Sequence, residues 1–102
     1  MALTVSNLED DTGLGFSGTL DLATEDQART ALKPHLHPGA AVTVDVGALE
    51  FMDSTGLNLI IGALSTLGED GRLTLRGAGG IVAKVLAVSG LTERPNVTVV
   101  PA

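Results

Sequence analysis

Hydrophobic residues alternate with polar residues in the middle of the chain and then change their spacing. Valines at every second position of residues 42–46 are typical of a strand with one buried face. The apolar residues that follow recur at the spacing of an amphipathic helix: Leu57, Ile60, Ile61, Leu64 and Leu67. Ser54 lies where the two spacings meet, so we expect it to cap this helix and to hold its hydroxyl at the surface.

The same patterns predict further elements on both sides of this unit. Strands are expected at residues 2–8, 14–20, 72–76 and 96–100, and helices from residue 24 to about residue 33 and over residues 81–88. Thr24 and Gln27 form a capping-box pattern, and Pro34 is expected to end or kink the first helix. Gly90 followed by Leu91 is typical of a left-handed helix end.

Two stretches that contain glycine predict irregular backbone in the first third of the chain. Residues 9–13 mix acidic residues with a glycine and are expected to form a hairpin loop between the first two strands. Glycines at positions 13, 15 and 18 weaken the second strand and indicate a bulge or a close approach of backbone.

This order of elements predicts an α/β fold in one domain that spans residues 1–102. The elements run strand, strand, helix, strand, helix, strand, helix, strand. Strands that alternate with helices imply a mostly parallel sheet of four or five strands with three or four helices, and the opening strand is expected to pair antiparallel.

Composition narrows the classes of function. Hydrophobic residues make up 44% of the chain and only Phe16 and Phe51 are aromatic, so we expect an aliphatic core. The net charge is −6 without a basic cluster, which argues against nucleic acid or an anionic membrane surface as a partner. The absence of cysteines and of any apolar run long enough to span a bilayer predicts a cytoplasmic protein without membrane insertion.

Three candidate sites for chemistry have simpler explanations. Ser54 as a catalytic nucleophile lacks both a nearby base and the glycine that opens a G-x-S-x-G elbow, because Met52 occupies that position. His35 and His37 have no evident third metal ligand. The glycines of residues 77–80 lack the Lys-Ser/Thr ending of a phosphate-binding loop and favour a strand-to-helix turn.

Three short segments carry a resemblance to a known family. They are Gly18-Thr19-Leu20-Asp21, Phe51-Met52-Asp53-Ser54-Thr55-Gly56-Leu57 and Ser89-Gly90-Leu91. On these motifs, and on the order of elements over about residues 14–100, the chain resembles the STAS domain family, in particular the small bacterial anti-sigma factor antagonists. The resemblance implies a mixed sheet with helices mostly on one side.

The resemblance also implies a non-enzymatic switch without a cofactor. In similar proteins the serine that follows the Asp of the D-S-x-G-L turn, here Ser54, is phosphorylated by an anti-sigma factor with serine-kinase activity. The unphosphorylated form binds that anti-sigma factor and releases the sigma factor, and a phosphatase resets the switch. Thr19 in place of the family's frequent Glu, and Pro34 in the first helix, are departures near the expected docking face.

The partner-binding face is expected to surround Ser54. The predicted partner-binding residues are Asp21, Asp53, Ser54, Thr55, Asn58, Leu59 and Gly62. Asn58, Leu59 and Gly62 belong, with Ala63 and Thr66, to a side of the second helix that we expect to be exposed and rich in small residues. Asp21 and Asp53 either orient the Ser54 hydroxyl or the kinase's ATP-bound metal, or they only cap turns. Thr55 is either a second phosphorylation site or simply a residue of the first helical turn.

Two other functions fit the same resemblance. One is an adaptor subunit of a membrane lipid-transport or other complex, without phosphorylation. The other is a module that binds a small ligand or a nucleotide.

Overall fold

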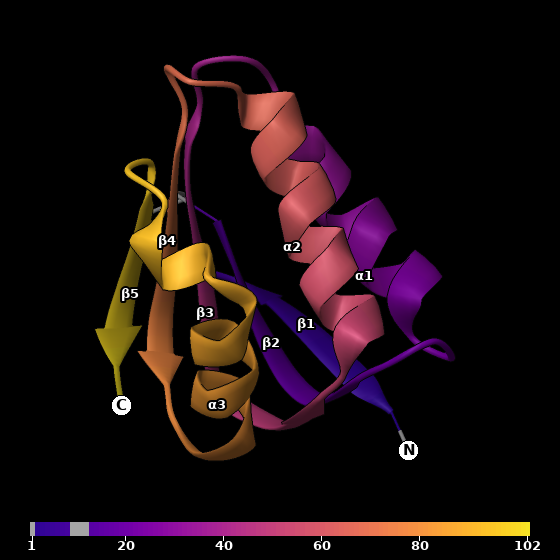
Figure 1. The fold of residues 1–102 in the computed structure, drawn as a ribbon. Helices are drawn as coiled ribbons and strands as arrows, with labels where there is room; N and C mark the ends of the chain where they lie inside the picture. The colour runs from indigo at the N-terminus through magenta and orange to yellow at the C-terminus, as the bar shows by residue number, and fades with distance from the viewer. Residues whose placement is uncertain (1, 9–12) are drawn as a thin grey trace.

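The computed structural model describes residues 2–8 and 13–102 and has the α/β architecture expected from the sequence (Figure 1). The strands are β1 (Leu3–Asn7), β2 (Gly13–Leu20), β3 (Ala41–Met52), β4 (Arg72–Ala78) and β5 (Val97–Pro101). The helices are α1 (Glu25–Leu32), α2 (Ser54–Leu67) and α3 (Gly80–Ser89), with single 3-10 turns at Lys33–His35 and Leu91–Glu93. Most of the predicted hairpin loop, residues 9–12, lies outside the described residues.

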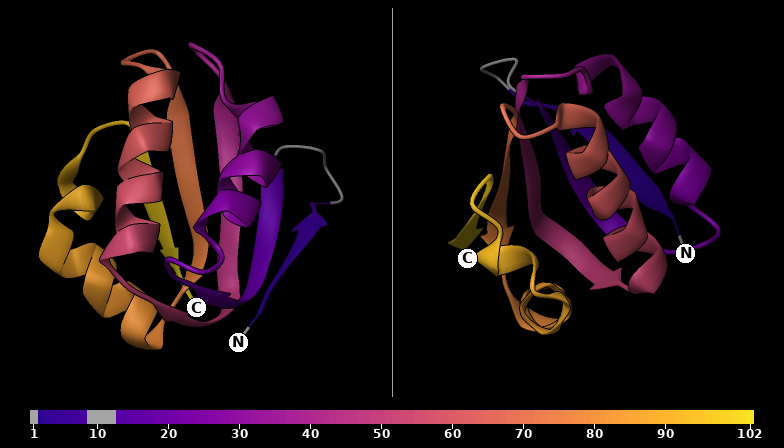
Figure 2. Two further views of the ribbon diagram at one scale, coloured as in Figure 1. Left: turned by 90° about the vertical axis from the view of Figure 1, so that its right-hand side faces the viewer. Right: turned by 45° about the horizontal axis from the view of Figure 1, so that its top comes forward.

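The five strands form one mixed sheet in the order in which they occur along the chain. β1 pairs antiparallel with β2, and the other neighbours pair parallel, as predicted. Parallel neighbours need crossover connections, which α1, α2 and α3 supply. Figure 2 shows all three helices on one side of the sheet. Because β2, β3 and β4 run parallel, their carboxyl ends point to the same edge of the sheet.

β3 is longer than the alternating valines predict. Its contact with β4 ends at the pair Asp45 and Arg76, but its contact with β2 continues to the pair Leu20 and Met52. The pairing with β2 therefore keeps residues 47–52 extended, although their side chains do not alternate cleanly. The β2–β3 register shifts twice, between Gly15 and Ser17 and between Gly18 and Thr19, and each time the extra residue lies on β3, so the bulge predicted for β2 is found on its neighbour. The other expectation, a close approach of backbone, is confirmed: Gly18 has a φ of +99°, and a Cβ atom there would lie 2.2 Å from the carbonyl oxygen of Ala2.

The first helix differs from its prediction at its start and agrees at its end. Thr24 precedes α1 but makes no capping hydrogen bond from its side chain, and Gln27 instead donates through Nε2 to the carbonyl of Leu3 at 2.8 Å. The predicted capping box is wrong because both side chains tie the helix to β1 and β2 rather than to its own amides. The helix ends at Leu32, just before Pro34, as predicted.

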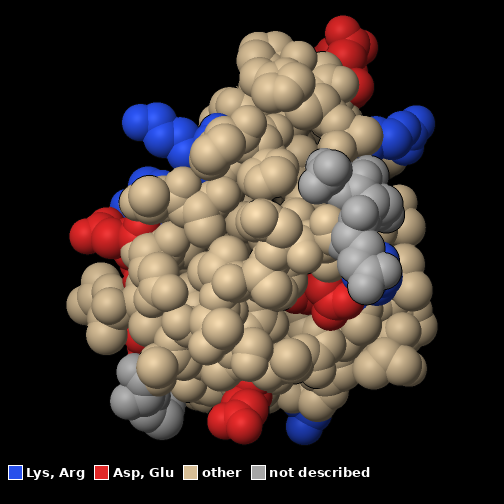
Figure 3. Space-filling model, turned by 180° about the vertical axis from the view of Figure 1, so that it is seen from behind, with Lys and Arg blue, Asp and Glu red and all other residues tan. Residues whose placement is uncertain are grey.

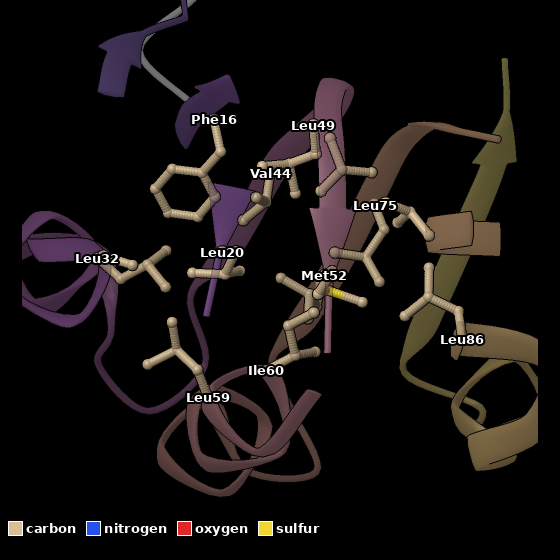
Figure 4. Close-up of a cluster of buried hydrophobic side chains, with 14 of the residues drawn as sticks. Phe16, Leu20, Leu32, Val44, Leu49, Met52, Leu59, Ile60, Leu75 and Leu86 are labelled. Carbon is tan, nitrogen blue, oxygen red and sulfur yellow. The ribbon is translucent and has the colours of Figure 1, made fainter. Parts of the chain in front are cut away.

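The core lies between the sheet and the helices and is almost entirely aliphatic, as the composition predicts. Figure 4 shows Phe16, Val44 and Leu75 of three neighbouring strands pointing toward the helices. Leu32, Ile60 and Leu86 meet them, one from each helix: α1, α2 and α3. The third helix ends as predicted, with Gly90 at a φ of +79° and Leu91 buried.

Within residues 2–8 and 13–102, no helix covers the other face of the sheet. Its polar strand positions include Asp45 and Arg76, whose Oδ2 and Nε atoms form an ion pair at 3.0 Å. Seen from behind in Figure 3, this side of the molecule is mostly uncharged, and most acidic and basic residues lie around its margin.

Candidate functional site

Ser54 is the first residue of α2 and is exposed. The residue that caps the helix is Asp53, which has extended backbone and accepts a 2.9 Å hydrogen bond at Oδ1 from the amide of Thr55. The predicted capping role of Ser54 is therefore wrong by one position, because aspartate is as good a cap as serine. The predicted exposure is observed, and the Ser54 hydroxyl has no hydrogen bond to another residue within the described chain.

The sheet brings the loop before α1 next to the start of α2. Leu20 and Met52 are paired across β2 and β3, so Asp21 and Asp53 leave the sheet from level strand ends. Gly56, in the first turn of α2, rests on these two side chains. A Cβ atom at Gly56 would lie 2.5 Å from Cγ of Met52 and 3.0 Å from Cδ2 of Leu20, so only glycine lets the helix begin this close to the sheet.

Asp21 holds the loop beside Ser54 in a tight turn. Its Oδ1 accepts a hydrogen bond from the amide of Ala23 at 3.0 Å, and its backbone carbonyl accepts one from the amide of Thr24 at 3.1 Å. Asp21 and Asp53 thus each stabilise a turn with one carboxylate oxygen. These contacts account for both residues locally, and a role toward a partner stays a prediction.

Thr55 is half-buried and belongs to the first turn of α2. Its amide makes the bond to Asp53, so it contributes to the cap through its backbone. The site therefore presents one exposed hydroxyl at the start of α2, that of Ser54, and two acidic turns from neighbouring strand ends beside it.

A protein-family model described as "Mlab, STAS domain" matches residues 3–101. The chain belongs to the STAS domain family. The match includes every described strand and helix, so the whole α/β unit is the STAS domain. No curated protein gives a match to the sequence.

Solved structures support the same STAS fold. An anti-sigma factor antagonist from Mycobacterium paratuberculosis is similar with a TM-score of 0.85 at 21% identity, over 99% of this chain and 87% of that one. The unphosphorylated form of the anti-sigma factor antagonist SpoIIAA is similar with a TM-score of 0.67 at 22% identity, over 99% and 89% of the two chains. At this identity the likeness establishes the shared fold.

The second helix of this STAS domain buries a wider face than predicted. Leu59 and Ala63, expected on the exposed side, are only 7% and 4% exposed, whereas Leu57 and Ile61 of the predicted core stripe are half-buried. The reason is that α2 packs on α1 as well as on the sheet. Asn58, Gly62 and Thr66 are exposed as predicted.

These positions line a groove of about 460 Å³ between α1 and α2. Leu59 and Ala63 lie at its base, and Asn58, Gly62 and Thr66 form its α2 side. Arg29 and Lys33 line it from the α1 side. Asn58, Gly62 and Thr66 follow Ser54 at intervals of four residues, so the exposed side of α2 runs from the hydroxyl into this groove.

The alternative sites have little support in the geometry. No group of three possible metal-ligating side chains occurs in the described residues, His35 and His37 included. Gly77 has a φ of +80°, and a Cβ there would lie 2.9 Å from Cα of Gly47, so this glycine serves the close approach of β4 to β3.

In residues 2–8 and 13–102, no helix has the length and apolar character needed to cross a membrane.

A cavity of about 710 Å³ lies at the other end of α2 from Ser54. It is lined by Leu64, Ser65, Gly68, Glu69, Asp70, Gly71, Arg72, Arg94, Pro95 and Asn96. Both acidic and basic side chains surround it, and it shares no lining residue with the α1–α2 groove.

Sequence reasoning missed one exposed residue in the loop that follows β2, at the edge of the sheet where Ser54 lies. Leu22 is 76% exposed, although its spacing of two residues from the buried Leu20 continues the strand pattern and suggests burial. The turn that begins at Asp21 interrupts this pattern and leaves Leu22 at its tip. An acidic turn former directly before the leucine was the available signal.

Proposed function

We propose that this STAS protein is an anti-sigma factor antagonist that binds its anti-sigma factor when Ser54 is unphosphorylated. The single observation that carries the proposal is the exposed Ser54 hydroxyl at the start of α2, which no described residue engages. Because Asp53 supplies the helix cap, Ser54 is available for modification without loss of the cap. Its place in the family and its likeness to anti-sigma factor antagonists support the same role.

A phosphate on Ser54 acts on the surface rather than on the fold. At a helix N-terminus the added negative charge is favourable, since free amides and the positive end of the helix dipole face it. The modification adds about −1.5 to −2 charges beside the carboxylate of Asp53, in a chain whose net charge is already −6. Burying this charge in an interface without a cation costs several kcal/mol, enough to turn a tight complex into a weak one.

The partner in this proposal is an anti-sigma factor with serine-kinase activity, and a phosphatase that acts on phosphorylated Ser54 resets the switch. The protein itself carries out no reaction and acts in the cytoplasm. Its binding face comprises Asp21, Asp53, Ser54, Thr55, Asn58 and Gly62, with Leu59 at the base of the adjoining groove.

The test is a pull-down from native cell extract with the wild type, Ser54→Ala and Ser54→Glu as baits, followed by intact mass after incubation with ATP. The expected result is that the wild type and Ser54→Ala retain a kinase, Ser54→Glu does not, and ATP adds one phosphate to the wild type only. Ser54→Ala is the matched control, because it removes the hydroxyl without adding charge.

The opposite result favours the adaptor function. If all three baits retain the same proteins and no phosphate is added, Ser54 is only the first residue of a helix. The ligand-binding function has its own test: nucleotides that raise the melting temperature of the wild type, but not of an Arg94→Ala variant, place that ligand in the cavity at the far end of α2.

A further inference from the structure

Leu22 is a large apolar side chain held out into solvent next to the proposed switch. Within the described chain, the exposed large hydrophobic residues are Leu22, Ile81, Val88 and Val100. The other three lie on α3 and β5, whereas Leu22 lies in the loop between β2 and α1. A single exposed leucine is common on protein surfaces, so its meaning depends on how it is held and on what lies beside it.

The backbone that carries Leu22 is fixed by a set of hydrogen bonds. The amide of Thr24 donates to the carbonyl of Asp21 at 3.1 Å and closes a turn over Leu22 and Ala23. The Thr24 hydroxyl accepts from the amide of Asp21 at 3.1 Å and donates to the carbonyl of Thr19 at 2.9 Å. Thr24 is only 6% exposed, so the hydrogen bond that connects the turn to the end of β2 is buried.

This turn and the start of α2 leave the sheet at the same edge. The level ends of β2 and β3 place the residues after Leu20 beside the residues after Met52, and Gly56 holds the first turn of α2 against both side chains. Leu22 is therefore presented at the same edge of the sheet as Ser54. The exposed side chain of Leu22 does not pack in the core. Because its turn is already held by hydrogen bonds, binding at Leu22 does not carry the entropic cost of ordering a loop.

We propose that Leu22 is the hydrophobic anchor of the surface that docks the anti-sigma factor, and that this partner offers an apolar pocket next to the site that receives Ser54. The inference rests on the proposed function for the identity of the partner. It divides the surface into two parts with different chemistry. Ser54 decides by its charge whether the complex forms, while Leu22 supplies apolar contact area whatever the state of the serine.

The two parts are expected to respond differently to substitution. Leu22→Ala removes most of the apolar area that this side chain would bury against the partner, and it is expected to weaken binding by about 10- to 100-fold. Leu22→Met keeps a side chain of similar volume and is expected to bind nearly as the wild type does. Val88→Ala is the matched control, because Val88 is 89% exposed on α3 and lies outside this surface.

The experiment measures the dissociation constant of each variant, by calorimetry or by surface-based binding, for the purified kinase obtained with the wild-type bait. Melting temperatures equal to that of the wild type show that all variants are folded. The anchor is supported if Leu22→Ala binds at least tenfold more weakly while Leu22→Met and Val88→Ala do not. It is overturned if Leu22→Ala binds within about twofold of the wild type.

The same measurements separate a failure of the anchor from a failure of the switch. If Ser54→Glu loses binding and Leu22→Ala does not, the anchor is wrong and the switch stands. If Leu22→Ala loses binding and Ser54→Glu does not, the charge switch is wrong, and Leu22 remains a contact for that partner.

Discussion

The amide of Thr55 donates a 2.9 Å hydrogen bond to Oδ1 of Asp53, across the backbone of Ser54. Because this bond supplies the cap of α2, Asp53→Ala is expected to lower the free energy of unfolding by about 0.5–2 kcal/mol. Urea denaturation followed by circular dichroism measures the change. Ser54→Ala is the control and is expected to stay within about 0.5 kcal/mol of the wild type. An equal loss in both variants would contradict the assignment of the cap to Asp53.

Gly56 is the position where α2 tolerates no side chain. A Cβ atom there would lie 2.5 Å from Cγ of Met52, well inside contact distance. We expect Gly56→Ala to lower the free energy of unfolding by about 1–3 kcal/mol, since the helix start must move away from the sheet. The same denaturation experiment measures this, and a neutral result would show that the core repacks freely under Ser54.

Gly62 gives the opposite expectation within the same helix. A Cβ atom there would meet nothing within 4 Å, and the residue is exposed. Gly62→Ala is therefore expected to raise the free energy of unfolding by about 0.5–1 kcal/mol, because alanine loses less backbone entropy in a helix. A thermal melt that shows no stabilisation would argue against an open groove at this position. Together with Gly56→Ala, this substitution tests whether the two glycines of α2 serve different purposes.

The buried hydroxyl of Thr24 is expected to stabilise the turn that carries Leu22. Thr24→Val keeps the shape of the side chain but leaves the Thr19 carbonyl and the Asp21 amide without their present partner, at an expected cost of about 1–3 kcal/mol. Thr24→Ser retains the hydroxyl and is expected to recover most of that loss. Hydrogen exchange at the Asp21 amide reports the same bond directly, and unchanged protection in Thr24→Val would be the contrary result.

The order of elements in this STAS fold was predictable from local periodicity. The alternating valines of β3 are buried as their spacing predicts, and the strand predicted at residues 72–76 is β4, whose Leu73 and Leu75 are buried. These features depend only on which residues avoid water along one element. The breaks in that pattern at Pro34 and Gly90 also depend on single residues with restricted or unusual backbone, and both were predicted correctly.

The wrong predictions concern residues that contact a second, distant element of the fold. Leu59 was assigned to the exposed side of α2 because one apolar stripe is enough to cover a sheet, but the contact with α1 buries a second stripe. The hydroxyl of Thr24 was assigned to a helix cap because a capping box is a local pattern, but a carbonyl of β2 is its actual partner. Contacts between distant segments leave no periodic signal in the sequence.

The position of Ser54 was predictable as a surface site, but its immediate setting was not. Asp53 and Ser54 are equally good caps by residue type, and only the backbone geometry distinguishes them. The neighbourhood of Leu22 depends on the register between β2 and β3, which bulges on β3 shift twice. Such register shifts decide which loop residues stand beside the serine.

The contact of Gly56 with Leu20 and Met52 also has a genetic consequence. The height and direction at which Ser54 is presented depend on two side chains that are each 1% exposed. Substitutions that enlarge Leu20 or Met52 are therefore expected to displace the serine without altering any residue of the proposed binding face. A random-mutagenesis screen for loss of partner binding is expected to recover folded variants with changes at these interior positions alongside those at the surface.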